Sequence, residues 1–238
     1  MPWPKTRPAL SVEDVSINED WQLHWLTISQ NQFSAVQRSN HGYVLKAGID
    51  LGTPILEVGA GGGQHLCLEL GRGTRPQDYR VLELRSDLAR ITAERFPGVQ
   101  VDVGDCQKRL PFESASLGRI VAIHVMEHLE DLPSFLDEAS RVLRPDGRLL
   151  AVIPCEGGIG YHLGRRVTSQ RLFEGRYKRP YGPFIRLEHL STAREILAAL
   201  PQRFRVESST WWPLRIPSVD LNLCVGLRLA PLTTNTSR

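Results

Sequence analysis

Short apolar runs alternate with amphipathic stretches through the middle of the chain. Apolar runs bounded by turn residues predict buried strands, and apolar residues three and four positions apart predict helices. The strands predicted in this way cover residues 54–58, 80–84, 99–103, 117–123 and 149–153. Strands that alternate with helices form a parallel sheet with right-handed crossovers, so the pattern predicts an α/β fold.

Start and stop signals mark the helices between these strands. The first predicted helix ends at Gly71 and Gly73, and the second is capped by Ser86 and stops before Pro97. Asp131 caps a third, whose apolar stripe has helical spacing. Later in the chain the pattern predicts a capping box over residues 192–195, a helix after it, and strands over residues 204–210 and 221–229.

The flanks of this pattern set the domain boundaries. Residues 1–16 are rich in proline and predict a flexible N-terminus, whereas residues 17–238 predict a single domain. Its predicted parts are an N-terminal helical cap (17–50), an α/β core (51–154), an irregular insertion (155–190), and a C-terminal helix with strands (191–238). The insertion has no clear period and contains Gly, Pro, Tyr and Arg.

Composition narrows the class without naming a function. The chain has 238 residues, 41% of them hydrophobic, and a net charge of +3, which is too small to indicate a nucleic-acid partner. No apolar run approaches the roughly 20 residues of a membrane span, and the start lacks a signal-peptide core. The four cysteines are scattered, so neither a zinc site nor a disulfide framework is predicted, and a cytoplasmic location is expected. Nothing in the pattern indicates an oligomeric state.

A glycine-rich turn carries the first chemical signal. Gly59, Gly61 and Gly63 lie between a predicted strand and helix, where a backbone without Cβ atoms turns sharply and approaches a ligand closely. The start of the helix leaves N–H groups free for an anionic group. A nicotinamide or flavin site remains an alternative, but its G-x-G-x-x-G pattern needs glycine where Gln64 stands.

Two carboxylates follow at the ends of the next two strands. Glu83 ends the second strand, where a carboxylate can accept hydrogen bonds from both hydroxyls of a ribose. Asp105 follows the third strand and can accept from an adenine amino group, with apolar neighbours to enclose the ring. Each could instead be an acid in a solvated turn.

The complete set of motifs resembles the class I S-adenosylmethionine-dependent methyltransferases, especially the broad small-molecule group that includes quinone-pathway enzymes. The motifs occur in order over roughly residues 50–155: residues 57–63, Glu83, Gly104 and Asp105 with residues 110–112, residues 126–129 and residues 141–147. The resemblance implies a Rossmann-like, seven-stranded, mostly parallel sheet with helices on both faces. It also implies an antiparallel strand near the C-terminus, an N-terminal helix and an irregular lid.

The resemblance further implies that S-adenosylmethionine is the methyl donor and that the core of residues 51–154 binds it. The glycine loop would cradle its methionyl end, Glu57 would anchor that loop, Glu83 would bind ribose, Asp105 adenine, and His124 would face the donor. The predicted cofactor-binding residues are Glu57, Gly59, Ala60, Gly61, Gly63, Gln64, Glu83, Leu84, Asp105, Cys106 and His124. Leu117 and Gly118 depart from the family, which often has Phe-Asp there.

Catalysis needs little more than alignment, because a sulfonium is already activated. His124, Glu127 and His128 follow the fourth strand and are the candidates for deprotonating an acceptor. For His128 we favour a second hypothesis, in which its side chain orders the loop. The resemblance to quinone-pathway enzymes permits a divalent ion on one carboxylate and one imidazole, but two ligands are too few to predict a metal site.

Only the insertion carries a signal about the methyl acceptor. Residues 161–190 hold seven Lys or Arg residues against two Glu, and they leave the sheet at its ligand-binding edge. They suit a lid over an anionic small molecule that is phosphorylated, nucleotide-linked or carrier-bound. The candidate substrate-binding residues are Tyr161, Arg165, Arg166, Tyr177 and Tyr181. The alternative is a solvated basic loop.

Two other function classes remain open. An NAD(P)-dependent oxidoreductase would share the fold and Glu83, but not Asp105 or the pair Glu127 and His128. A catalytically silent methyltransferase-like binding protein would keep the fold and lose the chemistry. A methyltransferase acting on a small molecule is the preferred interpretation.

Overall fold

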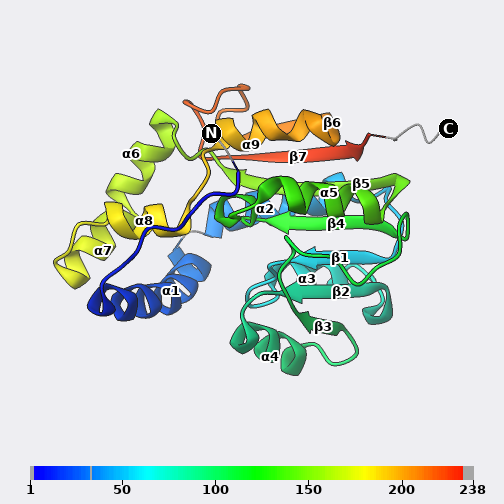
Figure 1. Ribbon diagram of the computed structural model, residues 1–238, viewed down its shortest axis with the longest axis horizontal. Helices are drawn as coiled ribbons and strands as arrows, with labels where there is room; N and C mark the ends of the chain where they lie inside the picture. Colours follow the sequence, from blue (N-terminus) through cyan, green and yellow to red (C-terminus); the bar gives the residue numbers. More distant parts are fainter. Residues whose placement is uncertain (1–2, 33, 233–238) are drawn as a thin grey trace.

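A single sheet forms the centre of the molecule. The computed structural model describes residues 3–32 and 34–232, apart from the side chains of residues 26 and 29–34. Within these ranges seven strands pair in the order β3-β2-β1-β4-β5-β7-β6 (Figure 1). Their bounds are β1 Ile55–Val58, β2 Tyr79–Glu83, β3 Gln100–Val103, β4 Leu117–Ile123, β5 Leu143–Pro154, β6 Phe204–Trp212 and β7 Cys224–Pro231.

Only β7 runs against the others: it is antiparallel to both β5 and β6, while the remaining pairs are parallel. The predicted fold class is therefore confirmed. The chain runs from β1 outward to β2 and β3, and then returns to place β4 on the other side of β1. Loops that leave β1 and β4 diverge at this reversal, which is where α/β sheets open a ligand-binding crevice.

Helices cover both faces of the sheet (Figure 1). On one face lie α2 (Ser34–Ala47), α3 (Gln64–Gly71) and the end of α4 (Ser86–Arg95), and their Val44, Leu66 and Phe96 share one core with β1, β2 and β4. On the other face α5 (Leu132–Val142) and α9 (Ala193–Ala199) bury Phe135 and Ile196 in a second core. Burial of both faces explains why the parallel strands read as continuous apolar runs.

The predicted caps are confirmed at two helices and wrong at one. Asp131 accepts a hydrogen bond from Ser134 N at 3.2 Å to begin α5, and the capping box of Thr192 and Glu195 begins α9. Ser86 is not a cap but the first residue of α4, after an extended Arg85 that makes no side-chain cap. Because Arg85 N donates to the Glu83 carboxylate at 3.1 Å, the backbone remains extended up to residue 85.

Two strands begin three or more residues away from their predicted starts. β5 begins at Leu143, which already pairs with Leu117, so the predicted turn of residues 145–147 is an irregularity within the strand. β7 begins at Cys224 rather than at residue 221. The buried Asn222 explains this, because its amide bonds Leu214 N, Ile216 O and Ser218 O and holds the preceding segment in a loop.

The prediction of an irregular insertion over residues 155–190 is wrong. The segment forms three helices, α6 (Ile159–Val167), α7 (Ser169–Tyr177) and α8 (Gly182–Glu188), which we call the lid. The lid packs against α1 (Val12–Gln32) beyond one end of the sheet (Figure 1). Trp21 of α1 joins Phe173, Tyr181, Phe184 and Ile185 in a third core. Helices of seven to nine residues are too short to show a clear period in the sequence.

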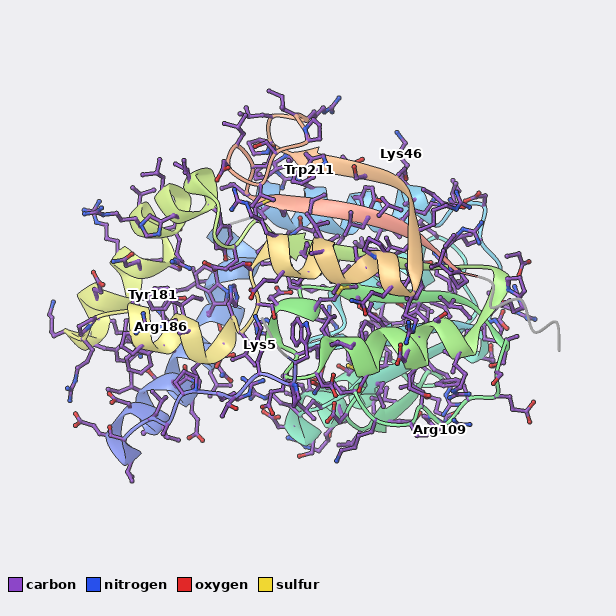
Figure 2. The ribbon with its side chains drawn as sticks, turned by 45° about the horizontal axis from the view of Figure 1, so that its top comes forward. Lys5, Lys46, Arg109, Tyr181, Arg186 and Trp211 are labelled. Atoms are coloured by element: carbon purple, nitrogen blue, oxygen red, sulfur yellow. The ribbon has the colours of Figure 1, made fainter. Side chains whose placement is uncertain are left out.

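The N-terminal segment ties the lid to the core. α1 begins at Val12, earlier than the predicted residue 17. Before it, Lys5 N donates to Glu130 O at 2.7 Å, and Lys5 Nζ donates to Leu190 O at 2.9 Å (Figure 2). The guanidinium of Arg7 bonds the carbonyls of Leu187 and His128, each at 2.8 Å. The predicted flexible N-terminus of residues 1–16 therefore includes a hydrogen-bonded strap and the first turn of α1. None of the described helices is both long and apolar enough to cross a membrane.

Candidate functional site

A cavity of about 600 Å³ lies over the carboxyl ends of the first four strands, and we call it the strand-end cleft. One wall consists of the loops that follow β1, β2, β3 and β4, and α1 and the end of the lid form the opposite wall. Its lining from the strand ends comprises Gly59, Gly61, Leu82, Glu83, Leu84, Gly104, Asp105, Cys106, His124 and Val125. The reversal of strand order thus opens a ligand-sized crevice, as in other doubly wound sheets.

The three glycines serve two different purposes. All have positive φ, at 67° for Gly59, 54° for Gly61 and 72° for Gly63. A Cβ on Gly59 would lie 2.7 Å from Val125 Cγ2, so this position admits no side chain between the loops after β1 and β4. A Cβ on Gly63 would collide with the ring of Phe96. Gly59 and Gly61 line the cleft, whereas Gly63 is required for packing against the core.

Glu83 is buried beneath the cleft and holds its floor. One carboxylate oxygen accepts from Gly61 N at 2.9 Å, and the other accepts from Arg85 N at 3.1 Å. Because Glu83 remains part of the cleft lining, the same carboxylate shapes the glycine loop and borders the cleft. Its place at the end of β2 is the one expected of a ribose-binding acid.

The far end of the cleft is suited to a flat ring. Asp105 Oδ1 accepts from both the backbone and the side-chain amide of Gln107, each at 2.9 Å, which fixes the carboxylate at the rim. Leu84 is 63% exposed although it is apolar, and it lines the cleft together with Cys106. An exposed apolar side chain beside a fixed carboxylate can bind an adenine by stacking and by one hydrogen bond.

Three predicted cofactor residues lie behind this lining. Glu57 accepts from the Tyr79 hydroxyl at 2.8 Å, and burial raises the pKa of Glu57 against the opposing effects of His65 and that hydrogen bond. This hydrogen bond joins Glu57 to β2 and not to the glycine loop. Ala60 is buried in the core, and Gln64 begins α3. None of the three is part of the cleft wall.

A second cavity, of about 330 Å³, lies between the lid and α2, and we call it the lid cavity. Trp25, Tyr161 and Tyr181 supply aromatic walls, with Val36 and Leu223 beside them. Trp25, His124 and His128 line both cavities. A molecule in the strand-end cleft and another in the lid cavity would therefore meet at these three side chains.

Comparison with known proteins agrees with this geometry. A family model described as a methyltransferase domain matches residues 56–151, from β1 to the middle of β5. Residues 56–151 are thus similar to a methyltransferase domain. Over 105 residues the chain is 34% identical to a probable S-adenosylmethionine-dependent methyltransferase of Mycolicibacterium smegmatis. The matched segment covers 43% of this chain and 38% of that relative. Over 100 residues the chain is 35% identical to a phthiotriol/phenolphthiotriol dimycocerosates methyltransferase of Mycobacterium leprae, covering 41% and 36%.

Solved structures of methyltransferases share the fold of this chain. The N-methyltransferase NodS from Bradyrhizobium japonicum, in complex with S-adenosylhomocysteine, superposes with a TM-score of 0.61 at 15% identity, covering 91% of this chain and 99% of that one. A geranyl diphosphate C-methyltransferase from Streptomyces coelicolor gives 0.61 at 13% identity, covering 84% and 82%. The chain spans less than half the length of the curated relatives above. The activity of the whole protein is therefore a proposal.

His124, which directly follows β4, is held from both sides. Its φ is 54°, its Nε2 lies 2.7 Å from Asn40 Nδ2, and its Nδ1 lies 3.2 Å from Glu127 Oε1. The Cys224 thiol donates to Asn40 Oδ1 at 3.0 Å and so orients the amide. With Asn40 donating to Nε2, His124 carries its proton on Nδ1 and donates to Glu127. Both ring nitrogens are engaged, so His124 is held in a fixed orientation between Asn40 and Glu127.

Glu127 and His128 follow in a short 3-10 turn (Met126–His128). Glu127 is fully buried, which acts to raise its pKa, but the hydrogen bond from His124 and the nearby His128 lower the pKa to about 2. His128 Nδ1 donates to Glu188 O in the lid at 2.7 Å, and burial lowers the pKa of His128. This bond supports the hypothesis that His128 orders the loop.

His128→Ala tests that hypothesis. The substitution removes the bond between the loop after β4 and the lid, so we expect it to lower the free energy of unfolding by about 1–2 kcal/mol. Because the same side chain lines the strand-end cleft, affinity for S-adenosylhomocysteine should fall together with stability. Denaturant melts and calorimetry measure the two quantities. A stable variant that binds this ligand normally but transfers no methyl group would identify His128 as a catalytic residue.

The structure separates the five predicted acceptor residues. Tyr161, Arg165 and Tyr181 line the lid cavity, whereas Arg166 is exposed outside it. Tyr177 packs against Trp21 in the third core. Figure 2 shows Tyr181 and Arg186 on the lid, where the Arg186 side chain is exposed.

Three of the seven basic residues of the lid pair with neighbouring acids. Arg165 binds Glu156 at 2.8 Å. Arg176 binds Asp20 at 3.1 Å, and Arg179 binds Glu13 at 2.6 Å, with both acids on α1. The excess of arginine counted in the sequence therefore overstates the charge that faces the cavity.

Four residues of the site have no signal in the sequence. His189, Asn40 of α2 and Trp25 of α1 line the lid cavity. Glu156 stands behind this lining and is bonded to His189 at 2.9 Å. They reach the site because the lid and the N-terminal helices fold over the carboxyl ends of the strands. A hydrophobic pattern could not have placed them there, because each lies in a different element from the motifs that were recognised.

Proposed function

We propose that this protein transfers a methyl group from S-adenosylmethionine, bound in the strand-end cleft, to a small molecule in the lid cavity. The observation that carries the proposal is the junction of the two cavities at Trp25, His124 and His128. A donor site alone would suit many nucleotide-binding proteins. A donor site that opens into a second cavity suits a reaction between two molecules.

The donor would lie along the ends of the strands. Gly59 and Gly61 allow its methionyl end to approach the backbone, Glu83 accepts from the ribose hydroxyls, and Asp105 accepts from the adenine amino group. NodS, of the same fold, is solved with S-adenosylhomocysteine, which supports this choice of donor. The glycine pattern of an NAD(P)-dependent oxidoreductase needs a glycine at position 64, where this chain has Gln64 at the start of α3.

The chemistry requires alignment above all. An acceptor atom attacks the methyl carbon, the carbon–sulfur bond breaks, and its electrons return to sulfur to leave S-adenosylhomocysteine. Holding the two reactants in line can supply roughly 7–11 kcal/mol of the barrier. In this chain the aromatic walls of the lid cavity and the fixed ring of His124 would provide the alignment, while the lid and α1 exclude water.

The lid cavity suits an acceptor with a flat or apolar body. Trp25, Tyr161 and Tyr181 offer stacking surfaces to such a body. The anionic group expected from the sequence depends on Arg165, because Arg166 lies outside the cavity. That guanidinium is already paired with Glu156, so an anionic acceptor would have to compete for it.

Ligand binding tests the donor half of the proposal. S-adenosylhomocysteine should raise the melting temperature and release heat on titration, whereas NADH should do neither. Stabilisation by NADH alone would favour the oxidoreductase, and no response to either compound would remove the proposed donor site. Transfer of a labelled methyl group to fractions of a metabolite extract then identifies the acceptor. Donor binding without transfer to any fraction would favour a silent binding protein.

A further inference from the structure

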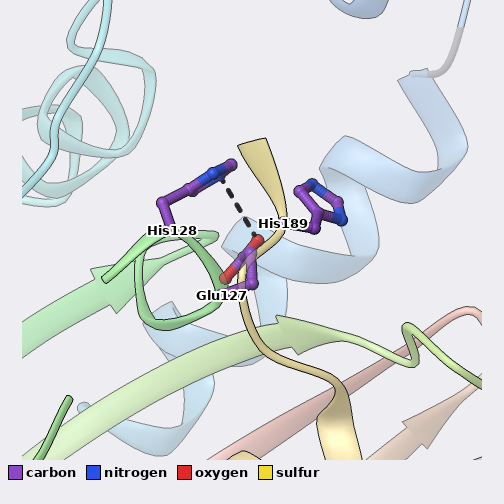
Figure 3. A group of neighbouring side chains, drawn as sticks. All are labelled: Glu127, His128 and His189. Atoms are coloured by element: carbon purple, nitrogen blue, oxygen red, sulfur yellow. Dashed lines mark ion pairs between the residues drawn. The ribbon is translucent and has the colours of Figure 1, made fainter. Parts of the chain in front are cut away.

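Three side chains with metal-ligating chemistry meet in the wall of the lid cavity. Glu127 and His128 come from the turn after β4, and His189 follows α8 at the end of the lid (Figure 3). Their candidate ligand atoms all lie within 4.8 Å of one another. His128 Nε2 is 3.8 Å from Glu127 Oε1. All three residues line the lid cavity.

Both imidazoles are oriented from behind. His128 Nδ1 is bonded to Glu188 O at 2.7 Å, and His189 Nδ1 is bonded to Glu156 Oε2 at 2.9 Å. Each ring therefore keeps its Nε2 available for another partner. Histidine ligands of metal ions almost always make such a bond from the other ring nitrogen, to a carboxylate or a backbone carbonyl. Glu156 is itself fixed by Arg165, so the supporting shell is complete around His189.

The carboxylate between the two rings lacks a partner on one side. Glu127 is fully buried, and among the described residues its Oε2 makes no hydrogen bond. A buried carboxylate oxygen without a donor is unfavourable by several kcal/mol unless a cation or a hydrogen bond compensates it. A bound cation would satisfy this oxygen and both free imidazole nitrogens at once.

We propose that Glu127, His128 and His189 bind one divalent transition-metal ion, with Zn²⁺ as its representative. Two imidazoles and one carboxylate suit such an ion and leave a coordination position open. That position faces the lid cavity, where an oxygen of a bound molecule, as in a hydroxyl or a carboxylate, can occupy it. Metal binding itself does not depend on methyl transfer, whereas a role in holding the acceptor rests on the proposed function.

Occupation requires a small inward movement. Ligand atoms about 2.0–2.2 Å from a tetrahedral ion stand roughly 3.4 Å from one another. The three candidate ligand atoms now lie within 4.8 Å of one another, so they would have to move closer together. His189 ends the lid, and Glu127 and His128 belong to the strand-end loops, so the ion would join the lid to the core. We therefore expect metal to stabilise the lid in its closed position.

Titration of metal-depleted protein without a polyhistidine tag tests the site. Zn²⁺ should bind with one ion per chain in calorimetry, and Co²⁺ should give a visible absorption spectrum typical of a low-coordinate N/O site. Glu127→Gln and His189→Ala should each weaken Zn²⁺ binding by about a hundredfold or more. Glu156→Gln, which removes the carboxylate that supports His189 and pairs with Arg165, should weaken it about 10–100-fold. His162→Ala alters an exposed histidine of the same lid and should leave the affinity unchanged.

Binding of S-adenosylhomocysteine, measured on the same samples, separates this inference from the proposed function. His189 does not line the strand-end cleft, so His189→Ala should lose metal and keep this ligand. Absence of stoichiometric Zn²⁺ binding by folded wild-type protein overturns the metal site, whatever the result with the nucleoside. Equal affinity in wild type, His189→Ala and Glu127→Gln overturns it as well. Circular dichroism of each variant confirms that it is folded.

Discussion

Arg119→Met should lower the free energy of unfolding by about 3–5 kcal/mol at neutral pH. Arg119 of β4 reaches through the core to Glu69 of α3, with Nη1 2.9 Å from Oε1, and both side chains are nearly inaccessible to solvent. Methionine retains much of the apolar volume but leaves the Glu69 carboxylate buried without its cation. Removal of one partner from a buried ion pair is therefore far more harmful than loss of a surface pair.

The pH dependence of this effect has a definite sign. Burial acts to raise the pKa of Glu69, but the hydrogen bond with His65 and the charge of Arg119 lower it from 4.5 to about 2. The stability that Glu69 contributes is therefore present above about pH 4.5 and is lost as the pH falls toward 2. Without Arg119 the pKa of Glu69 should rise, so that protonation relieves the buried charge. The deficit of the variant should narrow below about pH 4.5.

Denaturant unfolding at pH 7 and at pH 4 measures both effects. Arg90→Ala is the matched control, because it breaks an exposed pair with Glu94 at 2.9 Å and should change stability by no more than about 0.5 kcal/mol. The double variant Arg119→Met with Glu69→Gln should recover much of the loss, since no charge is then buried alone. A loss in Arg119→Met no larger than in Arg90→Ala would show that this ion pair does not hold β4 to α3.

Glu83→Ala should weaken binding of S-adenosylhomocysteine about 10–100-fold. Hydrogen bonds to a charged group contribute roughly 1.5–3 kcal/mol each, and the proposed donor would place its ribose on this carboxylate. The substitution also releases Gly61 N, so the glycine loop loses a constraint in the free protein. Both consequences weaken binding in the same direction.

Calorimetric titration with the nucleoside measures this effect, and a denaturant melt shows how much of it comes from a weakened fold. Glu113→Ala removes an exposed carboxylate from the loop after β3 and should leave the dissociation constant unchanged. An unchanged constant in Glu83→Ala, with wild-type stability, would assign Glu83 to the glycine loop alone and would remove the ribose contact from the proposed function.

The local pattern determined the sheet and most of the strand-end cleft. Residues 117–123 were predicted as a strand and form β4, because a parallel strand covered on both faces must be apolar at nearly every position. Asp131 was identified as a cap because its bond to Ser134 N spans only three residues. Gly59 and Glu83 were placed at one edge because consecutive parallel strands end on the same side of the sheet.

Tertiary structure decided everything that depends on partners distant along the chain. The lid helices bury Phe173 and Tyr181 against Trp21. Contact with α1 therefore sets the positions of their apolar residues, and such short helices do not display a clear hydrophobic period. His189 lies beside Glu127, and Glu156 neutralises Arg165, only because the lid folds back over the strand ends. Local propensity and periodicity act within about four residues along a helix and two along a strand. They therefore position the residues that the sheet itself holds, whereas side chains from the lid and from α1 are brought to the site by packing.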